Sequence, residues 1–187
     1  MPHIADSYSE SNFTGTFTMY LGNGEASKGQ SFTGDGTPIT SAKFYLAKTG
    51  SPPNNITCEL YAHTGTFGTD GKPTGSALAT ATPVSANSLS TSIALIEFTF
   101  PTPYTMAKGT NYCVAVTYND GDVGNRVNIG YDGTSPTHGG NLFYSAAGTA
   151  PWVGLSFYDT IFYVYGGDIA IGINNLRPAV FKPGIAR

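Results

Sequence analysis

Short segments in which apolar and polar residues alternate, separated by Asn-Gly and Asp-Gly pairs, constrain the fold of this chain most. In the segment 56–62 every even-numbered residue is apolar, whereas Thr57 and Glu59 lie between them. A period of two is typical of strands that bury one face, and Asn-Gly and Asp-Gly pairs favour the positive φ angles of tight turns. The pattern predicts strands at 13–21, 42–48, 56–63, 93–100, 112–118, 127–131, 141–145, 155–158, 161–165 and 169–173. It also predicts a long surface loop at 63–78.

The composition agrees with strands rather than helices. Only 11% of the 187 residues are charged, against about 25% in an ordinary soluble domain. Tyr and Phe, which favour strands, supply 12 and 11 residues. The length suits one domain with a core that requires no disulfide or metal. We therefore predict an all-β fold, an antiparallel β-sandwich of jelly-roll type.

Charge separates the end of the chain from the rest. Segment 175–187 holds Arg177, Lys182 and Arg187 and no acid, so the net charge of −3 divides into −6 and +3. Without a basic face there is no electrostatic case for nucleic acid, and no apolar run is long enough to predict a membrane span. The first residues lack the pattern of a signal peptide, so synthesis in a cytoplasm is expected. Pro178, Pro183 and Gly184 disfavour regular structure and predict an extended C-terminal arm.

We find no pattern typical of a catalytic or metal site. His3, His63 and His138 lack metal-ligand spacing, and Cys58 and Cys113 lie in apolar runs that predict buried, free thiols. Glu59 and Glu97 fall on the polar faces of their strands, so a glycosidase pair is disfavoured. Segment 119–125 resembles the start of a calcium loop but lacks its closing glutamate, which favours a plain turn. We therefore predict no enzyme, no metal and no cofactor.

The single tryptophan, Trp152, leaves two interpretations open. It either packs against the end of the sandwich or stacks on a sugar ring, because an indole offers a flat apolar face with a polar edge.

Several short segments together resemble the jelly-roll "choice-of-anchor" domains of bacterial surface proteins and phage structural proteins. They are GQSFT at 29–33, ITSAKFYL at 39–46, CELY at 58–61, FTF at 98–100, AKGTNY at 107–112 and DTIFYVYG at 159–166. The resemblance covers about residues 28–167 and implies a non-enzymatic sandwich, similar to a carbohydrate-binding module, used for display or attachment. The ending FKPGIAR at 181–187 is similar to the Phe-x-Pro-Gly-x-Ala-Arg ending of tailed-phage virion proteins.

These observations give one expected organisation and two expected functions. The divisions are an N-terminal extension with the first strand at 1–27, the sandwich at 28–173 and the arm at 174–187. The first function is that of a virion structural protein, a phage capsid decoration or head-appendage protein made in the host cytoplasm, which forms homo-oligomers and binds other virion proteins. The arm residues expected to bind the partner are Arg177, Phe181, Lys182, Pro183, Ile185 and Arg187. The alternative is a carbohydrate-binding or receptor-binding domain in which Trp152 contacts a host glycan.

Overall fold

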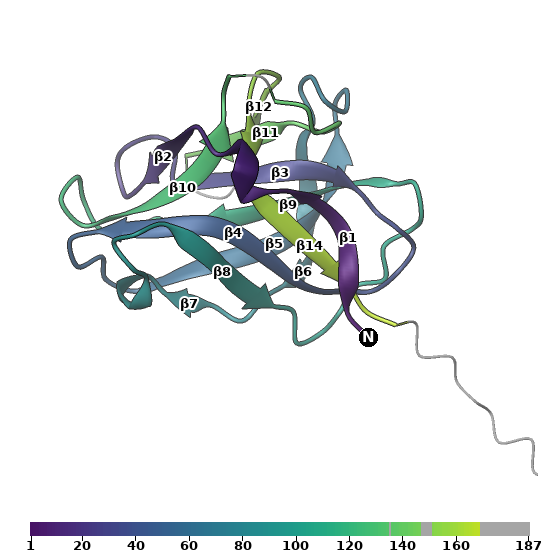
Figure 1. Ribbon diagram of the computed structural model, residues 1–187, viewed down its shortest axis with the longest axis horizontal. Helices are drawn as coiled ribbons and strands as arrows, with labels where there is room; N and C mark the ends of the chain where they lie inside the picture. The colour runs from purple at the N-terminus through teal and green to yellow at the C-terminus, as the bar shows by residue number, and fades with distance from the viewer. Residues whose placement is uncertain (135, 147–150, 169–187) are drawn as a thin grey trace, which may run out of the picture.

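The computed structural model describes residues 1–134, 136–146 and 151–168, and these form two antiparallel sheets packed face to face (Figure 1). The predicted all-β sandwich is confirmed. The first sheet contains β1 (His3–Tyr8), β2 (Gly15–Met19), β4 (Ile39–Thr49), β8 (Ala94–Thr99), β10 (Arg126–Asp132), β13 (Asp159–Thr160) and β14 (Phe162–Gly166). The second contains β3 (Ser27–Thr33), β5 (Asn55–Thr64), β6 (Lys72–Thr80), β7 (Val84–Ser85), β9 (Asn111–Thr117), β11 (Leu142–Ser145) and β12 (Val153–Leu155). Two short 3-10 helices, η1 (Glu10–Asn12) and η2 (Ala86–Ser88), lie in the connections.

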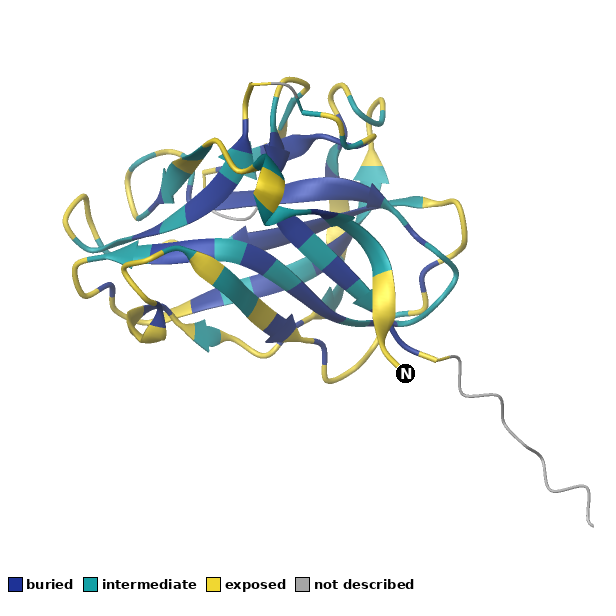
Figure 2. Cartoon of the chain, in the orientation of Figure 1, coloured by how far each residue is buried: buried dark blue, intermediate teal, exposed yellow. Residues whose placement is uncertain are grey.

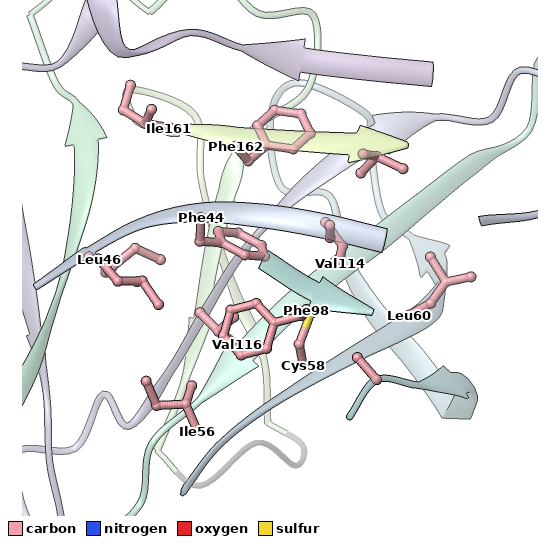
Figure 3. Close-up of a cluster of buried hydrophobic side chains, with 14 of the residues drawn as sticks. Phe44, Leu46, Ile56, Cys58, Leu60, Phe98, Val114, Val116, Ile161 and Phe162 are labelled. Carbon is pink, nitrogen blue, oxygen red and sulfur yellow. The ribbon is translucent and has the colours of Figure 1, made fainter. Parts of the chain in front are cut away.

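The core lies between the sheets and consists of the apolar half of each alternating strand. Phe44 of β4 and Phe98 of β8 meet Cys58 of β5 and Val116 of β9 there, all fully buried (Figure 3). Burying one such side chain contributes roughly 1.5–3 kcal/mol, so the alternation itself provides the driving force for the sandwich. Figure 2 shows the result, with buried positions along the strands and exposed positions in the loops.

The first sheet forks along β4. The beginning of β4 pairs with β14, from Ile39 opposite Gly166, whereas its end pairs with β10, from Leu46 opposite Ile129. Strand β13, just before β14, pairs with the end of β10 and places Asp159 opposite Asp132. The fork therefore brings two acidic residues together near the edge strand β1, which pairs with β14.

Four expectations about individual segments were wrong. The region 63–78 is not one long loop, because Lys72–Thr80 forms β6 beside β5. Segment 1–27 contains two complete strands, and Ser27–Thr33 forms the unpredicted β3. The predicted strand at 155–158 instead ends at Leu155 in β12. In β6 the sequence Lys-Pro-Thr-Gly disfavours a strand, and cross-strand pairing with β5 overrides that propensity.

The predicted strand at 169–173 and the arm at 174–187 lie outside the described residues. Within the described part of the chain, no helix is long and apolar enough to cross a membrane.

Candidate functional site

Trp152 lies on the outer face of the second sheet, the face turned away from the core. Its indole meets the rings of Tyr61 and Phe143 edge-on, with ring centroids 5.8 Å and 5.5 Å away. Phe143 is fully buried and Tyr61 nearly so, whereas Trp152 keeps part of its surface exposed. The tryptophan therefore covers the middle of a sheet face rather than the end of the sandwich.

Polar groups border this aromatic cluster. The Tyr61 hydroxyl donates to Oε2 of Glu59 at 2.5 Å, and burial raises the pKa of Tyr61 well above its usual value. The connection 65–71 folds over the same face, because a Cβ on Gly154 would stand 2.7 Å from Cα of Asp70. Asn141 fastens that connection by donating from Nδ2 to the Gly71 carbonyl at 2.9 Å. Trp152, Glu59 and the 65–71 connection thus form a surface of mixed aromatic and polar character.

A second cluster, which we call the buried polar network, lies between the sheets at the fork. It consists of Asp6, Gln30, His138, Asp159 and Thr160. Oδ1 of Asp159 accepts from Nε2 of Gln30 at 2.6 Å, and Oδ2 accepts from the His138 backbone N–H at 3.1 Å. The side-chain oxygen of Gln30, Oε1, accepts a hydrogen bond from the Thr160 backbone N–H at 2.8 Å. The side chain of Gln30 thereby links β3 of the second sheet to β13 of the first sheet.

The network extends to the N-terminal strand through two side chains of β1. Oδ1 of Asp6 lies 3.1 Å from Nε2 of His138, and Oδ2 accepts from the Thr33 backbone N–H at 3.1 Å. The Tyr8 hydroxyl donates to Oδ2 of Asp132 at 2.8 Å. Strand β1 is therefore held by side chains reaching both sheets as well as by its ladder with β14.

Burial dominates the electrostatics of the network. Asp159 is 1% exposed, and loss of hydration raises the pKa of its carboxyl group to about 6. Hydrogen bonding from Gln30 and the charge of His138 oppose this rise, and the negative charge of Asp132 adds to it. A carboxyl group that titrates near pH 6 can change its charge under mildly acidic conditions.

The two cysteines are buried and free, as predicted. Cys58 belongs to the core between the sheets, whereas Cys113 packs with Tyr61 and Phe143 on the outer face of the second sheet. A disulfide requires Cβ atoms that face one another, so these two thiols cannot pair without rearrangement. Burial raises the pKa of both thiols, which keeps them protonated and unreactive.

The remaining acidic candidates have structural partners. The Asp122 carboxylate accepts from the backbone N–H groups of Gly124 and Asn125, as in a plain turn. Glu59 and Glu97 lie on the outer faces of different sheets, and Glu97 pairs with Lys43 at 3.8 Å. Among the described residues, no group of three or more His, Cys, Asp or Glu side chains is placed to hold a metal ion.

The predicted arm residues lie outside the described part of the chain. They are Arg177, Phe181, Lys182, Pro183, Ile185 and Arg187. No local pattern in the sequence indicates the buried polar network, because its members come from four separate segments of the chain. The one available hint was polar residues at inward positions of 27–33, where Lys28 and Gln30 flank Gly29.

Comparison with known proteins adds no relative. No family model, no curated protein and no solved structure matches this chain.

Proposed function

We propose that this chain is a non-enzymatic structural protein of a virus particle, a phage capsid decoration or head-appendage subunit. In this proposal the sandwich is displayed on the particle and the basic segment 175–187 binds a neighbouring virion protein. Arg177, Lys182 and Arg187 would meet acidic groups of the partner, and Phe181 and Ile185 would bury their side chains in it.

The supporting observation is the way in which the sandwich holds Gly166, Gly167 and Asp168, the last residues that the structure describes before that segment. The Gly167 backbone N–H donates to the Pro38 carbonyl at 2.8 Å. A Cβ on Gly166 would lie 2.1 Å from Oγ1 of Thr37, so only glycine fits between β1 and the β3–β4 turn. Asp168 bonds the amino group of Met1, which places the last described residue beside the N-terminus (Figure 1). The described chain thus ends at a position that the sandwich holds, and six residues, 169–174, separate that position from the proposed binding segment.

Truncation tests the proposal. We expect the chain without residues 175–187 to unfold at the same temperature as the full chain, because the described sandwich ends before them. The truncated chain should be absent from purified particles that carry the full-length chain, as measured by quantitative mass spectrometry. Normal incorporation of the truncated chain would place the attachment site on the sandwich and overturn the proposal.

Two substituted chains distinguish the chemistry of attachment. Phe181→Ser with Ile185→Ser removes the apolar contacts and leaves the charges, whereas Lys182→Gln with Arg187→Gln does the reverse. Incorporation should fall in both chains, and the incorporation that remains should depend more steeply on salt in the first chain and less steeply in the second. A scrambled 175–187 segment of the same composition serves as the control for charge alone.

A second candidate function is glycan binding, favoured by the part-exposed indole of Trp152 beside Glu59 and the 65–71 connection. Sugar rings stack on such indoles, and carboxylates accept hydrogen bonds from sugar hydroxyls. The wild-type chain should then bind some glycans on an array of bacterial surface glycans, and Trp152→Ala should abolish that binding. Leu21→Ala, which removes an apolar side chain that is 58% exposed on another loop, should leave that binding unchanged. An array on which the wild-type chain retains nothing would remove this candidate.

A further inference from the structure

The outer face of the second sheet has a floor of small residues against which Trp152 packs. In the central row across the sheet, Glu59 of β5 pairs with Ala115 of β9. Ala115 pairs with Gly29 of β3, and Gly29 pairs with Phe143 of β11. A methyl group and a hydrogen atom are the side chains that separate Glu59 from Phe143 in this row. The floor therefore leaves room for large rings to lie over it.

Tyr61 connects the indole of Trp152 to the carboxylate at the other end of that row. Its ring centroid lies 5.8 Å from that of Trp152, and its hydroxyl donates to Oε2 of Glu59 at 2.5 Å. The other carboxylate oxygen, Oε1, accepts from the Thr80 hydroxyl at 3.4 Å. A carboxylate oxygen can accept more than one hydrogen bond, and Glu59 is half-buried, so it can still accept from a ligand. An oligosaccharide stacked on Trp152 can therefore reach this carboxylate.

Hydroxyl groups border the same carboxylate. In the neighbouring row, Thr57 of β5 pairs with Thr117 of β9, and both keep part of their surface exposed. Thr57 and Glu59 project from the same face of β5, because successive side chains of a strand alternate between its faces. Threonine hydroxyls can donate to and accept from sugar hydroxyls whatever charge the sugar carries. These residues favour a sugar, and its charge is selected by Glu59.

The charge of Glu59 has no basic partner among the described residues. None of the ion pairs in that part of the chain includes Glu59. Lys72 of the neighbouring strand β6 pairs with Thr64, five positions along β5 from Glu59 and so about 16 Å away. Recognition of a carboxylate or phosphate group favours arginine or lysine, whereas the chain outside 175–187 has six basic and twelve acidic residues, a net charge of −6. Electrostatics therefore disfavour an acidic glycan at this surface and favour a cationic one.

A sugar that carries a protonated amine matches both parts of this surface. Its ring can stack on the indole of Trp152, and its ammonium group can donate a charge-assisted hydrogen bond to Glu59. An ammonium group near the face of an indole is also attracted to it, because the face of the π system is negative. N-acetylation removes both electrostatic attractions, since an amide carries no net charge.

We propose that this surface selects glycans with free amino groups and that Glu59 determines the selection. The inference rests on the second candidate function, glycan binding, and names the class of glycan. Trp152 supplies a stacking contact that sugars share, whereas Glu59 discriminates a free amine from its acetylated form and from acidic sugars.

N-acetylation of the bound glycans tests the proposal. The wild-type chain is applied at pH 6.0, where sugar amines are protonated, to an array of bacterial surface glycans. The glycans that retain it are acetylated on nitrogen with acetic anhydride, and binding is measured again. Acetylation should weaken binding by at least about fivefold, which corresponds to about 1 kcal/mol.

The outcomes separate this proposal from the function on which it rests. Binding that acetylation leaves unchanged, or a retained set of glycans without free amines, would overturn the selection by Glu59 and leave glycan binding intact. An array that retains nothing would remove glycan binding itself, and this inference with it.

Two variants and one competitor assign the effect. Glu59→Gln can still accept from Tyr61 but has no charge, so its affinity for the free amine should fall to that for the acetylated glycan. Glu97→Gln removes a carboxylate from the outer face of the other sheet and should keep the wild-type preference. A tetralysine peptide, which has ammonium groups and no sugar ring, should not displace the glycan at equal concentration. A preference that survives in Glu59→Gln, or equal displacement by tetralysine, would contradict the proposal. The acetylation experiment uses the wild-type chain and so holds whether or not the variants fold.

Discussion

Two polar side chains of β3, Lys28 and Gln30, point between the sheets, where an apolar residue would be expected. Gln30 is satisfied by four hydrogen bonds. Lys28 is 1% exposed, and its ammonium group bonds Glu25 and lies over the rings of Phe17 and Tyr144. Burial lowers the pKa of Lys28, because the charged form loses hydration. Both residues lie on the inward face of β3. The hydrogen-bonding groups of the Gln30 amide are all paired, whereas the buried charge of Lys28 costs free energy of hydration.

The charge of Lys28 should be dispensable. Lys28→Met retains the buried stem and removes the cost of burying an ammonium group, and the freed Glu25 keeps contact with water. A buried ion pair replaced by an apolar side chain is often neutral or stabilising, so the free energy of unfolding should change by less than about 1 kcal/mol or rise. Urea unfolding at pH 7.5 measures this. Lys28→Ala, the control, also loses the packing of the stem and should cost about 2 kcal/mol or more.

Asp159 gives the stability a pH dependence opposite to the usual one for a carboxyl group. Its pKa is about 6 when folded and near 4 when unfolded, so the folded chain binds the proton more tightly and this contribution to stability rises as pH falls. His63, whose pKa burial lowers, acts in the opposite direction below pH 6.5. The two effects overlap, so the comparison with a variant is more informative than the wild-type profile alone.

The free energy of unfolding of the wild type, minus that of Asp159→Asn, should increase by roughly 1 kcal/mol between pH 7.5 and pH 5. Asn does not titrate, and the contribution of His63 cancels in the difference. Urea titrations at several pH values provide the measurement. A difference that stays constant over this range would show that Asp159 does not change its protonation state there.

At the scale of elements, strand β3 depends on a glycine at its centre. A Cβ on Gly29 would stand 2.1 Å from the Val114 carbonyl and 2.7 Å from the Phe143 ring. Gly29→Ala should therefore push β3 away from β9 and lower the free energy of unfolding by about 3 kcal/mol. Gly139→Ala, whose new Cβ would meet only Phe67 at 3.6 Å, should lower it by less than about 1 kcal/mol. Equal effects of the two substitutions would show that β3 adapts.

The two thiols test the assignment of strand faces. Because Cys58 and Cys113 lie on opposite faces of the second sheet, reductant together with a metal chelator should leave the melting temperature within about 2 °C. Neither thiol should react with a labelling reagent until the chain unfolds. A fall of more than about 10 °C would reveal a covalent or metal bond absent from this arrangement.

The sequence predicted those strands in which apolar and polar residues alternate regularly. Strands β4, β5 and β9 alternate regularly, and each was predicted to within a few residues. Strand β3 was missed because its inward residues Lys28 and Gln30 invert the alternation. The buried polar network could not be predicted, because residues as far apart as Asp6 and Asp159 meet only through the fork of the first sheet.

At the scale of the whole molecule, the sandwich has one end where the last described residue lies beside the N-terminus, and it has edges where strands remain open. Met1, Asp168 and the turn before β4 meet at the first end. Strand β12 forms an edge of the second sheet and has only three residues. Short edge strands limit pairing with other chains, but apolar side chains beside such an edge favour association. The edge at β12 has two of them, Val153 and Phe157, which are 40% and 77% exposed.

We expect the chain to self-associate through this edge. Phe157→Asp should shift the purified chain toward monomer in light scattering, because a charge at the centre of an apolar contact must lose its hydration when the contact forms. Leu21→Asp introduces the same charge at a residue that is 58% exposed on another loop, and it should leave the mass distribution unchanged. Both variants should melt like the wild type, since neither residue belongs to the core. A wild-type chain that remains monomeric at about 100 μM, or a Phe157→Asp chain that associates as strongly as the wild type, would exclude the β12 edge as the contact.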